Sequence, residues 1–322
     1  MSRRSILSVL MFALILVRLQ GGAAPPVAPE PAGKEALYGP AVQVGTIVDP
    51  EIAEASGLAA SRRDDNLLWV INDSGNPAAL FAITPNGRIL GKFILAGTPN
   101  DDWEDLASFT LDQIPYLLIA DTGDNMAGRT HFALYVVEEP EVMEGLQVQE
   151  GTLPVKWRIQ FAYPDGPRDC EAAAVDVPRK RVLLLSKHSR SPVLYELPLL
   201  PDAAEVKATV IGPASIPRPT PEDVRQPYGF SWSRPTAMDL STDGSRLVIL
   251  TYKHAYAFVK PPEQSWRSAI AAPGVTVPLP HPGVGLLPIR EGLCIQPSTG
   301  DLFVAGESPP APVFRLKRLA VH

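Results

Sequence analysis

Short apolar runs alternate with polar turns along the chain from about residue 41 onward. The runs are rich in β-branched and aliphatic residues and are broken by Gly, Pro, Asn and Asp. Such runs predict short β-strands, because these residue types suit a pleated, half-buried surface. No stretch keeps a helical apolar period over roughly a dozen residues, the length that a stable amphipathic helix needs. The pattern therefore predicts an all-β protein.

Five segments of the chain share one pattern. Each begins with a short strand, passes a polar turn into a strongly aliphatic strand, and continues through a polar loop to a third strand. The aliphatic strands are LLWVI, YLLIA, VLLLS, LVILT and LFVAG, at residues 67–71, 116–120, 182–186, 247–251 and 302–306. Repeated units of this kind are typical of a β-propeller, in which each repeat forms one blade.

Further runs can complete the blades. Four segments are followed by a candidate outer strand, at residues 87–95, 155–163, 205–212 and 274–280. The last segment lacks one, and AVQVGTIVD at residues 41–49 can fill the gap. We therefore predict five four-stranded blades in a ring closed by an N-terminal strand, which leaves no long exposed sheet edge. The proline-rich stretch 213–234 is interpreted as an insertion between blades three and four; a degenerate sixth blade is the alternative.

The N-terminus has the features of an export signal. Arg3 and Arg4 precede an apolar run at residues 6–17, and small residues follow at 22–24. The run is shorter than a membrane span, so an uncleaved anchor is the less favoured alternative. We expect the protein to be periplasmic or secreted, without stable membrane insertion. The expected division is a signal peptide at 1–24, a proline-rich linker at 25–40 and one propeller domain at 41–322.

Charge and cysteine content narrow the possible partners and cross-links. Without residues 1–24 the chain has 26 basic and 35 acidic residues, a net charge of −9. Nucleic acid phosphates would be repelled, so no nucleic-acid partner is expected, whereas a cation is compatible. Cys170 and Cys294 fall in the first strands of blades three and five. Those blades are not neighbours in a five-bladed ring, so we expect two buried thiols rather than a disulfide.

One position recurs at the start of the five first strands. First strands line the central channel of a propeller, so these side chains are expected to meet at its mouth. A single acid there would be interpreted as a solvated turn residue, but three in a narrow channel raise one another's pKa unless a cation compensates them. Ligands that offer only oxygen favour Ca²⁺ over zinc. The predicted metal ligands are Ser56, Glu104, Glu171, Thr236 and Glu291.

This set of residues resembles the channel ligands of the soluble calcium-activated nucleotidases, or apyrases. Those proteins are five-bladed propellers with a central calcium ion and one ligand per blade, in the order Ser, Glu, Glu, Ser, Glu. The segment CEAAAVD at residues 170–176 is also similar to the third-blade segment of that family. The motifs SGL, WEDLA and EAA look more like a group of uncharacterised exported bacterial propeller proteins. The resemblance implies the fold and the calcium ion, and nucleotide hydrolysis less directly.

The loops after the second strands are expected to surround the same mouth. They supply Asp73 and Asp121 as general-base candidates and Lys187 as an anion clamp, and Arg168 precedes a first strand as a second clamp. Ordinary turn chemistry also explains these residues. Two functions follow: a calcium-dependent hydrolase of phosphate-containing substrates, or a non-catalytic module with a structural calcium that binds a small anion or an envelope or extracellular protein or glycan. A third alternative is a lactonase- or esterase-type propeller, which would need a histidine or aspartate near the calcium ion; His188 is the residue that supports it.

Overall fold

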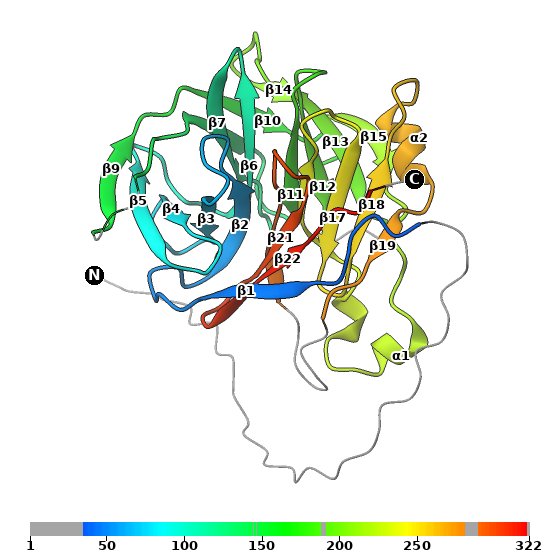
Figure 1. Cartoon of the computed structure of the whole chain (residues 1–322). Coiled ribbons are helices and arrows are strands. Elements are labelled where there is room, and N and C mark those ends of the chain that lie inside the picture. The colour runs from blue at the N-terminus through cyan, green and yellow to red at the C-terminus, as the bar shows by residue number, and fades with distance from the viewer. Residues whose placement is uncertain (1–34, 144, 146, 188–190, 281–288, 321–322) are drawn as a thin grey trace, which may run out of the picture. The chain divides into compact units, whose positions relative to one another are not determined.

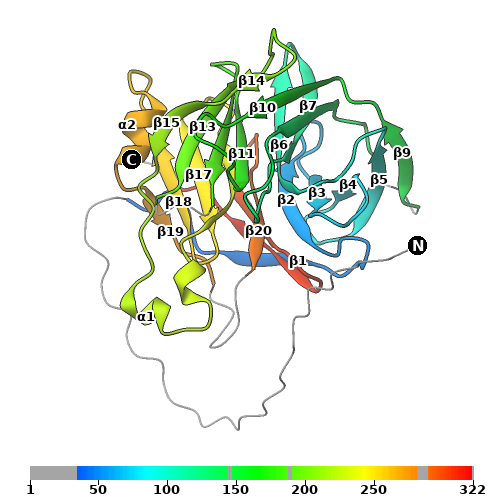
Figure 2. The same ribbon diagram turned by 180° about the vertical axis from the view of Figure 1, so that it is seen from behind.

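The computed structural model describes residues 35–143, 145, 147–187, 191–280 and 289–320. The predicted signal peptide, the linker up to residue 34 and His188 lie outside these residues. The described chain forms five small sheets of four or five strands arranged in a ring (Figures 1 and 2). This is a five-bladed β-propeller, as the sequence pattern predicted. Among the described residues, no helix is long and apolar enough to cross a membrane.

Each blade is a meander of antiparallel strands, counted from the channel outward. Blade one consists of β2 (Ala55–Ala60), β3 (Leu68–Asn72), β4 (Ala79–Ile83) and β5 (Ile89–Leu95). Blade two consists of β6 (Trp103–Leu111), β7 (Ile114–Asp121), β8 (Phe132–Glu138) and β10 (Trp157–Ala162). Blade three consists of β11 (Cys170–Asp176), β12 (Arg181–Ser186), β13 (Val193–Pro198) and β15 (Thr209–Pro213).

The remaining two blades bring the ends of the ring together. Blade four consists of β16 (Pro235–Leu240), β17 (Arg246–Thr251), β18 (Ala255–Val259) and β19 (Val275–Val277). Blade five consists of β20 (Arg290–Ile295), β21 (Leu302–Gly306), β22 (Ala311–Leu316) and β1 (Val42–Ile47). The N-terminal strand β1 pairs antiparallel with β22, and the two lie side by side in Figure 1. Closure by an N-terminal strand is therefore confirmed.

Residues 149–153 form a strand that was not predicted, and the outer strand predicted over residues 205–212 is divided, so that only β15 joins blade three. β9 (Gln149–Leu153) lies parallel to β5 and widens blade one, although it belongs to the connection within blade two. β14 (Val206–Lys207) lies parallel to β10 and widens blade two, although it belongs to the connection within blade three. Each of these strands covers an outer edge with chain from the following repeat, which protects that edge from pairing with other proteins.

The stretch 213–234 is an insertion, as predicted, and not a sixth blade. After β15 ends at Pro213 it contains only the short helix α1 (Pro221–Val224) and the 3₁₀ turn η1 (Gly229–Ser231). The Thr220 side chain caps α1 by accepting a hydrogen bond from the Asp223 backbone N–H. A further short helix, α2 (Trp266–Ala271), lies between β18 and β19.

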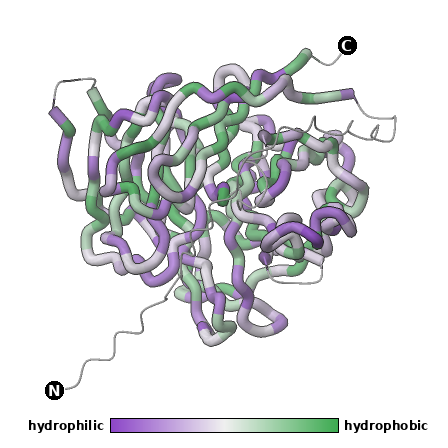
Figure 3. Tube along the Cα trace, turned by 90° about the horizontal axis from the view of Figure 1, so that it is seen from below, coloured by the Kyte–Doolittle hydropathy of each residue, from purple (hydrophilic) through white to green (hydrophobic). Residues whose placement is uncertain are grey.

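The hydrophobic core lies between neighbouring blades. One cluster, for example, joins Leu183 and Leu185 of blade three to Met238 and Ile249 of blade four. Hydrophobic and hydrophilic residues alternate at short intervals along the chain (Figure 3). Trp103 is fully buried in the cluster between blades one and two. Burial of each large apolar side chain contributes about 1.5–3 kcal/mol. Because each blade is a single sheet, its apolar side chains are buried against the neighbouring blades, and these contacts hold the ring together.

Both cysteines are buried and neither forms a disulfide. Cys170 lies in β11 and Cys294 lies in β20, so one blade separates them in the ring. Burial raises the pKa of both thiols. They therefore act as small core side chains, as predicted, and not as reactive groups.

Candidate metal centre

A β-bulge marks the start of every first strand. In each blade the pairing register between the first and second strands shifts by one residue, so that a single residue of the first strand is unpaired. Bulges re-aim the side chain of the extra residue and recur at functional sites. The five bulged residues are those at the repeated position in the sequence: Ser56, Glu104, Glu171, Thr236 and Glu291.

The two hydroxyls of this set connect neighbouring blades. Ser56 Oγ donates a hydrogen bond to the backbone carbonyl of Glu104 at 2.7 Å and also lies 3.4 Å from its Oε2. Thr236 Oγ1 donates to the backbone carbonyl of Arg290, the residue before Glu291, at 2.7 Å. Each hydroxyl therefore braces the bulge of the following blade.

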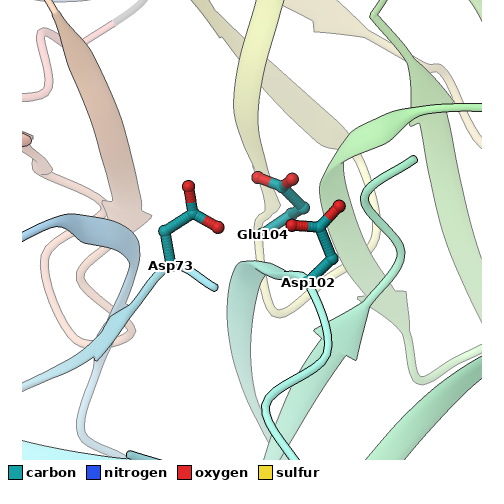
Figure 4. Close-up of side chains that lie close together, drawn as sticks. All are labelled: Asp73, Asp102 and Glu104. Carbon is teal, nitrogen blue, oxygen red and sulfur yellow. The ribbon is translucent and has the colours of Figure 1, made fainter. Parts of the chain in front are cut away.

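The carboxylates form a larger group than the sequence indicated. Oxygen atoms of Asp73, Asp102 and Glu104 lie within 4.8 Å of one another, and so do oxygen atoms of Glu104, Asp169 and Glu171. These five residues are called the acidic cluster below. Figure 4 shows Asp73 approaching from one strand end while Asp102 and Glu104 face it from the other side of the same space. Glu104 belongs to both groups and lies at the centre of the cluster.

The acidic cluster changes from buried to partly exposed along its length. Glu104 and Glu171 are almost completely buried, with 3% and 2% of their surface exposed. Asp73 and Asp102 are only partly buried, so the cluster opens to solvent at that end. One oxygen of Glu171, Oε2, is buried without a hydrogen-bond partner among the described residues. Burial of a carboxylate oxygen without a hydrogen bond costs free energy unless a cation or a water molecule supplies the missing contact.

The loop after β7 shapes the cavity around the cluster. A Cβ atom on Gly123 would collide with Glu104 Oε1 and Asp102 Oδ2. Any residue other than glycine at this position would therefore displace the two oxygens. The Gly123 backbone N–H donates to the Asp102 carbonyl at 3.1 Å. The Asp124 backbone N–H donates to Asp169 Oδ1 at 2.9 Å. The loop is therefore fitted to two carboxylates from blade two and one from blade three.

The pKa values of the cluster are raised. Burial is the main cause for Glu104 and Glu171, and repulsion from neighbouring carboxylates raises the pKa of each further. Burial also raises the pKa of Asp73 to about 6, with Asp102 and Glu54 adding repulsion. Burial together with Glu291 and Asp73 raises the pKa of Glu307 to about 8. Without a cation, the site therefore holds protons that ordinary carboxyl groups would have lost.

Lys187 provides a positive charge inside this group. Its ammonium contacts Glu171 Oε1 and lies 5.5 Å from the centre of the Tyr252 ring. Burial by itself would lower the pKa of Lys187, but Glu171 outweighs that effect and raises it. Glu291 Oε1 accepts a hydrogen bond from the Tyr252 hydroxyl at 3.1 Å. Glu291 thus faces the same mouth, at its blade-five side, without joining either close group of acids.

The side chains of Asp121 and Arg168 form ion pairs with residues outside the acidic cluster. Asp121 Oδ1 forms an ion pair with Arg129 at 2.8 Å and accepts the Asp102 backbone N–H, so it braces the loop after β7. The Arg168 guanidinium forms an ion pair with Asp165 at 2.8 Å and donates to the Tyr195 hydroxyl. Of the four candidate catalytic residues, the structure brings only Asp73 and Lys187 to the cluster.

Sequence reasoning overlooked Asp102 and Asp169 as possible ligands. Both stand two residues before a predicted glutamate ligand, Asp102 before Glu104 and Asp169 before Glu171. Glu54 occupies the equivalent position before Ser56. A second repeated acidic position was therefore present in blades one to three. Because residues two apart on a regular strand share a face, the spacing could have indicated that both acids of each pair approach the same cavity.

Asp105, the residue after Glu104, joins three blades through its buried carboxylate. Asp105 Oδ2 accepts backbone N–H bonds from Ala173 at 2.7 Å and from Met238 at 3.1 Å, and Oδ1 accepts from Leu106 at 2.8 Å. Asp105 is completely buried. It therefore links the first strands of blades two, three and four, and it serves the fold rather than the metal centre.

The donor set of the acidic cluster suits a hard divalent cation. All its side-chain donors are carboxylate oxygens, and hydroxyls of Ser56 and Thr236 lie at the neighbouring bulges. Ca²⁺ accepts six to eight oxygen ligands in flexible geometry, whereas zinc prefers nitrogen and sulfur donors. The orphaned Glu171 Oε2 and the space kept by Gly123 are further features that fit such an ion.

Comparison with known proteins assigns no family to the chain. No family model matches the chain, and no curated protein matches its sequence. Among solved structures, similar chains include hydrazine synthase of Kuenenia stuttgartiensis, with 10% identity, 83% of this chain and 84% of the other covered, and a TM-score of 0.44. The PQQ-bound aldose sugar dehydrogenase of Streptomyces coelicolor has 11% identity, coverage of 86% and 97%, and a TM-score of 0.46. Myxococcus xanthus glutaminyl cyclase has 9% identity, coverage of 87% and 97%, and a TM-score of 0.45.

Proposed function

We propose that this protein is an exported, calcium-binding β-propeller that hydrolyses phosphate-containing substrates at its channel mouth. The observation that carries the proposal is the convergence of five carboxylates from three blades around Glu104. The apyrase-like order of the bulged residues supports the choice of Ca²⁺ and of a phosphate-containing substrate. The arginine-led apolar run near the N-terminus supports export.

Glu104, Glu171, Asp102 and Asp169 would hold the ion. Glu104 and Glu171 come from adjacent first strands and supply buried carboxylates, while Asp102 and Asp169 precede them by two residues. When bound, Ca²⁺ supplies positive charge that can hold an anionic substrate beside water. Since Asp73 and Asp102 are partly exposed, the substrate would approach from their end of the cluster.

Asp73 is the general base in this proposal. Burial raises its pKa to about 6 in the metal-free protein, and a cation bound nearby would lower that pKa, so Asp73 would be ionised near neutral pH. Its position at the solvent end of the cluster puts it beside the expected substrate. Lys187 would contribute a fixed positive charge at the opposite side, next to Glu171. Asp121 and Arg168 have no part in this scheme, because their partners lie elsewhere.

A non-catalytic module with a structural calcium is the second candidate. The observation that favours it is the use of Ser56 and Thr236 as braces between neighbouring blades. An ion held by Glu104 and Glu171 would add a further link between blades two and three at the same level of the channel. In this case the mouth would bind a ligand without changing it.

Asp73→Asn separates the two functions. Asparagine has nearly the same shape and keeps one side-chain oxygen, but its amide cannot act as a general base. Hydrolysis of nucleoside diphosphates and of a simple aryl phosphate would be measured with Ca²⁺ and with chelator, beside the calcium-dependent rise in Tm. For the hydrolase we expect the variant to lose at least about 10²-fold in kcat while it keeps most of the Tm rise. If the wild-type protein shows the Tm rise but hydrolyses none of these substrates, the structural-calcium function is the better one.

A further inference from the structure

A second polar site lies at the opposite end of the propeller from the acidic cluster. The first strands begin at the mouth, so the turns that follow them lie at the far face. Two of these turns, β16–β17 and β20–β21, line a cavity of about 200 Å³ between blades four and five. Its lining includes two arginines, Arg246 and Arg318, and the hydroxyl residues Ser298 and Thr299.

The guanidinium groups of Arg246 and Arg318 converge in this cavity. Arg246 Nη2 lies 3.2 Å and Arg318 Nη1 lies 3.3 Å from the point where a Cβ on Gly300 would stand. Gly300 has a φ of +74°, so its turn favours glycine and leaves that space open. Two positive groups placed so close together repel each other unless an anion lies between them.

No ion pair joins Arg246 or Arg318 to a carboxylate in the described part of the chain, but the Asp243 carboxylate lines the same cavity and lies within electrostatic range of Arg246. Arg246 is 7% exposed, and its Nε is buried without a hydrogen-bond partner among those residues. The carboxylate of Asp243 accepts hydrogen bonds from Ser241 and Ser245. Asp301 pairs with Arg315 at 2.7 Å. Asp243 and Asp301 therefore have other hydrogen-bond or ion-pair partners, and among the described residues neither forms an ion pair with the two arginines. The Arg246 guanidinium also lies 5.6 Å from the centre of the Tyr38 ring.

A second cavity adjoins the first. It has a volume of about 560 Å³ and shares Gln296, Ser298 and Thr299 with the arginine cavity. The remainder of its lining includes the polar residues Asp65, Asn66, Thr84 and Asn86. Gln296 is 3% exposed, and its Oε1 is buried without a partner among the described residues, so it offers an acceptor to a ligand hydroxyl. This lining suits a molecule that carries several hydroxyl groups.

We propose that this far-face site binds a phosphorylated sugar, with the phosphate between Arg246 and Arg318 and the hydroxylated body in the adjoining cavity. Guanidinium groups match phosphate oxygens with paired hydrogen bonds. A phosphate dianion balances the charge of two guanidinium groups, whereas a carboxylate ligand would balance only one. The amides and hydroxyls of the second cavity can pair with sugar hydroxyls. The inference is independent of the proposed function, because no residue of the acidic cluster takes part.

Calorimetric titration with glucose 6-phosphate tests the site, with EDTA present so that the channel mouth contributes no calcium. Glucose, inorganic phosphate and glucuronate are the matched probes. We expect glucose 6-phosphate to bind at least tenfold more tightly than any of the three. Arg318→Ala should weaken its binding at least tenfold, and so should Arg246→Lys. The exposed neighbour Lys317 supplies the control, since Lys317→Ala should leave the affinity unchanged.

Several outcomes would overturn this assignment. One is the absence of glucose 6-phosphate binding by the wild-type protein, and another is unchanged affinity in Arg318→Ala, an exposed position whose replacement should not affect folding. Equal affinity for glucuronate would contradict the choice of phosphate. Binding that is lost in Glu104→Gln while the far-face variants keep it would place the ligand at the channel mouth. Conversely, binding that survives in Glu104→Gln supports the far-face site whatever the fate of the calcium proposal.

Discussion

Carboxylate oxygens of Glu104 and Glu171 lie within 4.8 Å of each other, although the two residues belong to different blades. Both side chains are almost fully buried, so their mutual repulsion is only weakly screened by water. Lys187 compensates Glu171 directly, while Glu104 has no ion-pair partner among the described residues. The charge state of this pair should therefore control stability as well as cation binding.

Calcium should stabilise the protein, and Glu104→Gln should remove that effect. At a Ca²⁺ concentration 100 times Kd, binding contributes about 2.7 kcal/mol, which for a domain of this size raises Tm by roughly 5–10 °C. Glu104→Gln should abolish the rise and, because it relieves repulsion, should also raise the Tm of the chelated protein. Thermal unfolding with Ca²⁺, Mg²⁺ and EDTA measures both changes.

The exposed residue Glu150 provides the matched control for this experiment. Glu150→Gln removes one negative charge far from the cluster and should keep the full calcium-dependent rise. A Tm that does not respond to Ca²⁺ in the wild-type protein would contradict the metal centre. So would an equal response in Glu104→Gln.

Gly123→Ala should disrupt the metal centre through shape alone. The added methyl group would collide with Glu104 Oε1 and Asp102 Oδ2 and displace both oxygens. We expect calcium affinity, measured by calorimetry, to fall at least tenfold. Gly128→Ala in the same loop is the control, because a Cβ there meets no atom within 4 Å. Equal calcium affinity of the two variants would show that the position of these oxygens does not matter to the ion.

Stability of the metal-free protein should fall as pH rises. The pKa values of Glu104 and Glu171 are raised in the folded state, and those of Asp73 and Glu307 are raised to about 6 and about 8. The folded protein therefore binds these protons more tightly than the unfolded chain. This contribution is fully present below the unfolded values, near pH 4, and is lost as pH rises through the folded values.

Measurement of Tm at pH 5.5 and pH 8, with EDTA and with saturating Ca²⁺, tests this linkage. The calcium-dependent rise should be larger at pH 8, because fewer protons then compete for the carboxylates. A calcium effect that is the same at both pH values would mean that the ion does not bind to the carboxylates with raised pKa.

Asp105→Ala should destabilise the propeller whether or not calcium is present. The change leaves the backbone N–H groups of Ala173 and Met238 without their acceptor in a buried channel. Each orphaned donor costs about 1–3 kcal/mol, so we expect a loss of roughly 2–5 kcal/mol in the free energy of unfolding. Urea unfolding in EDTA measures this loss. A loss that disappears when Ca²⁺ is removed would instead connect Asp105 to the metal centre.

The sequence by itself indicated five blades, the closing strand and the repeated position, and the structure excluded the alternative of a sixth blade at residues 213–234. These features depend on local alternation of apolar and polar residues and on internal repetition, both of which are visible without coordinates. The sequence also indicated Asp73 as a residue of the mouth. It missed β9 and treated β14 and β15 as one outer strand, because pairing with a preceding blade leaves no local signature in the sequence.

Only the tertiary structure decided which side chains meet. It showed that a β-bulge at each first strand presents the repeated residue, and that Asp102 and Asp169 join Glu104 while Glu291 remains to one side. It also turned Asp121 and Arg168 toward Arg129 and Asp165. The physical reason is that a strand pattern assigns residues to a face, whereas distances between blades depend on packing and register around the whole ring. The arginine pair at the far face likewise depends on packing between blades, since Arg246 and Arg318 lie in different blades and meet only when the ring closes.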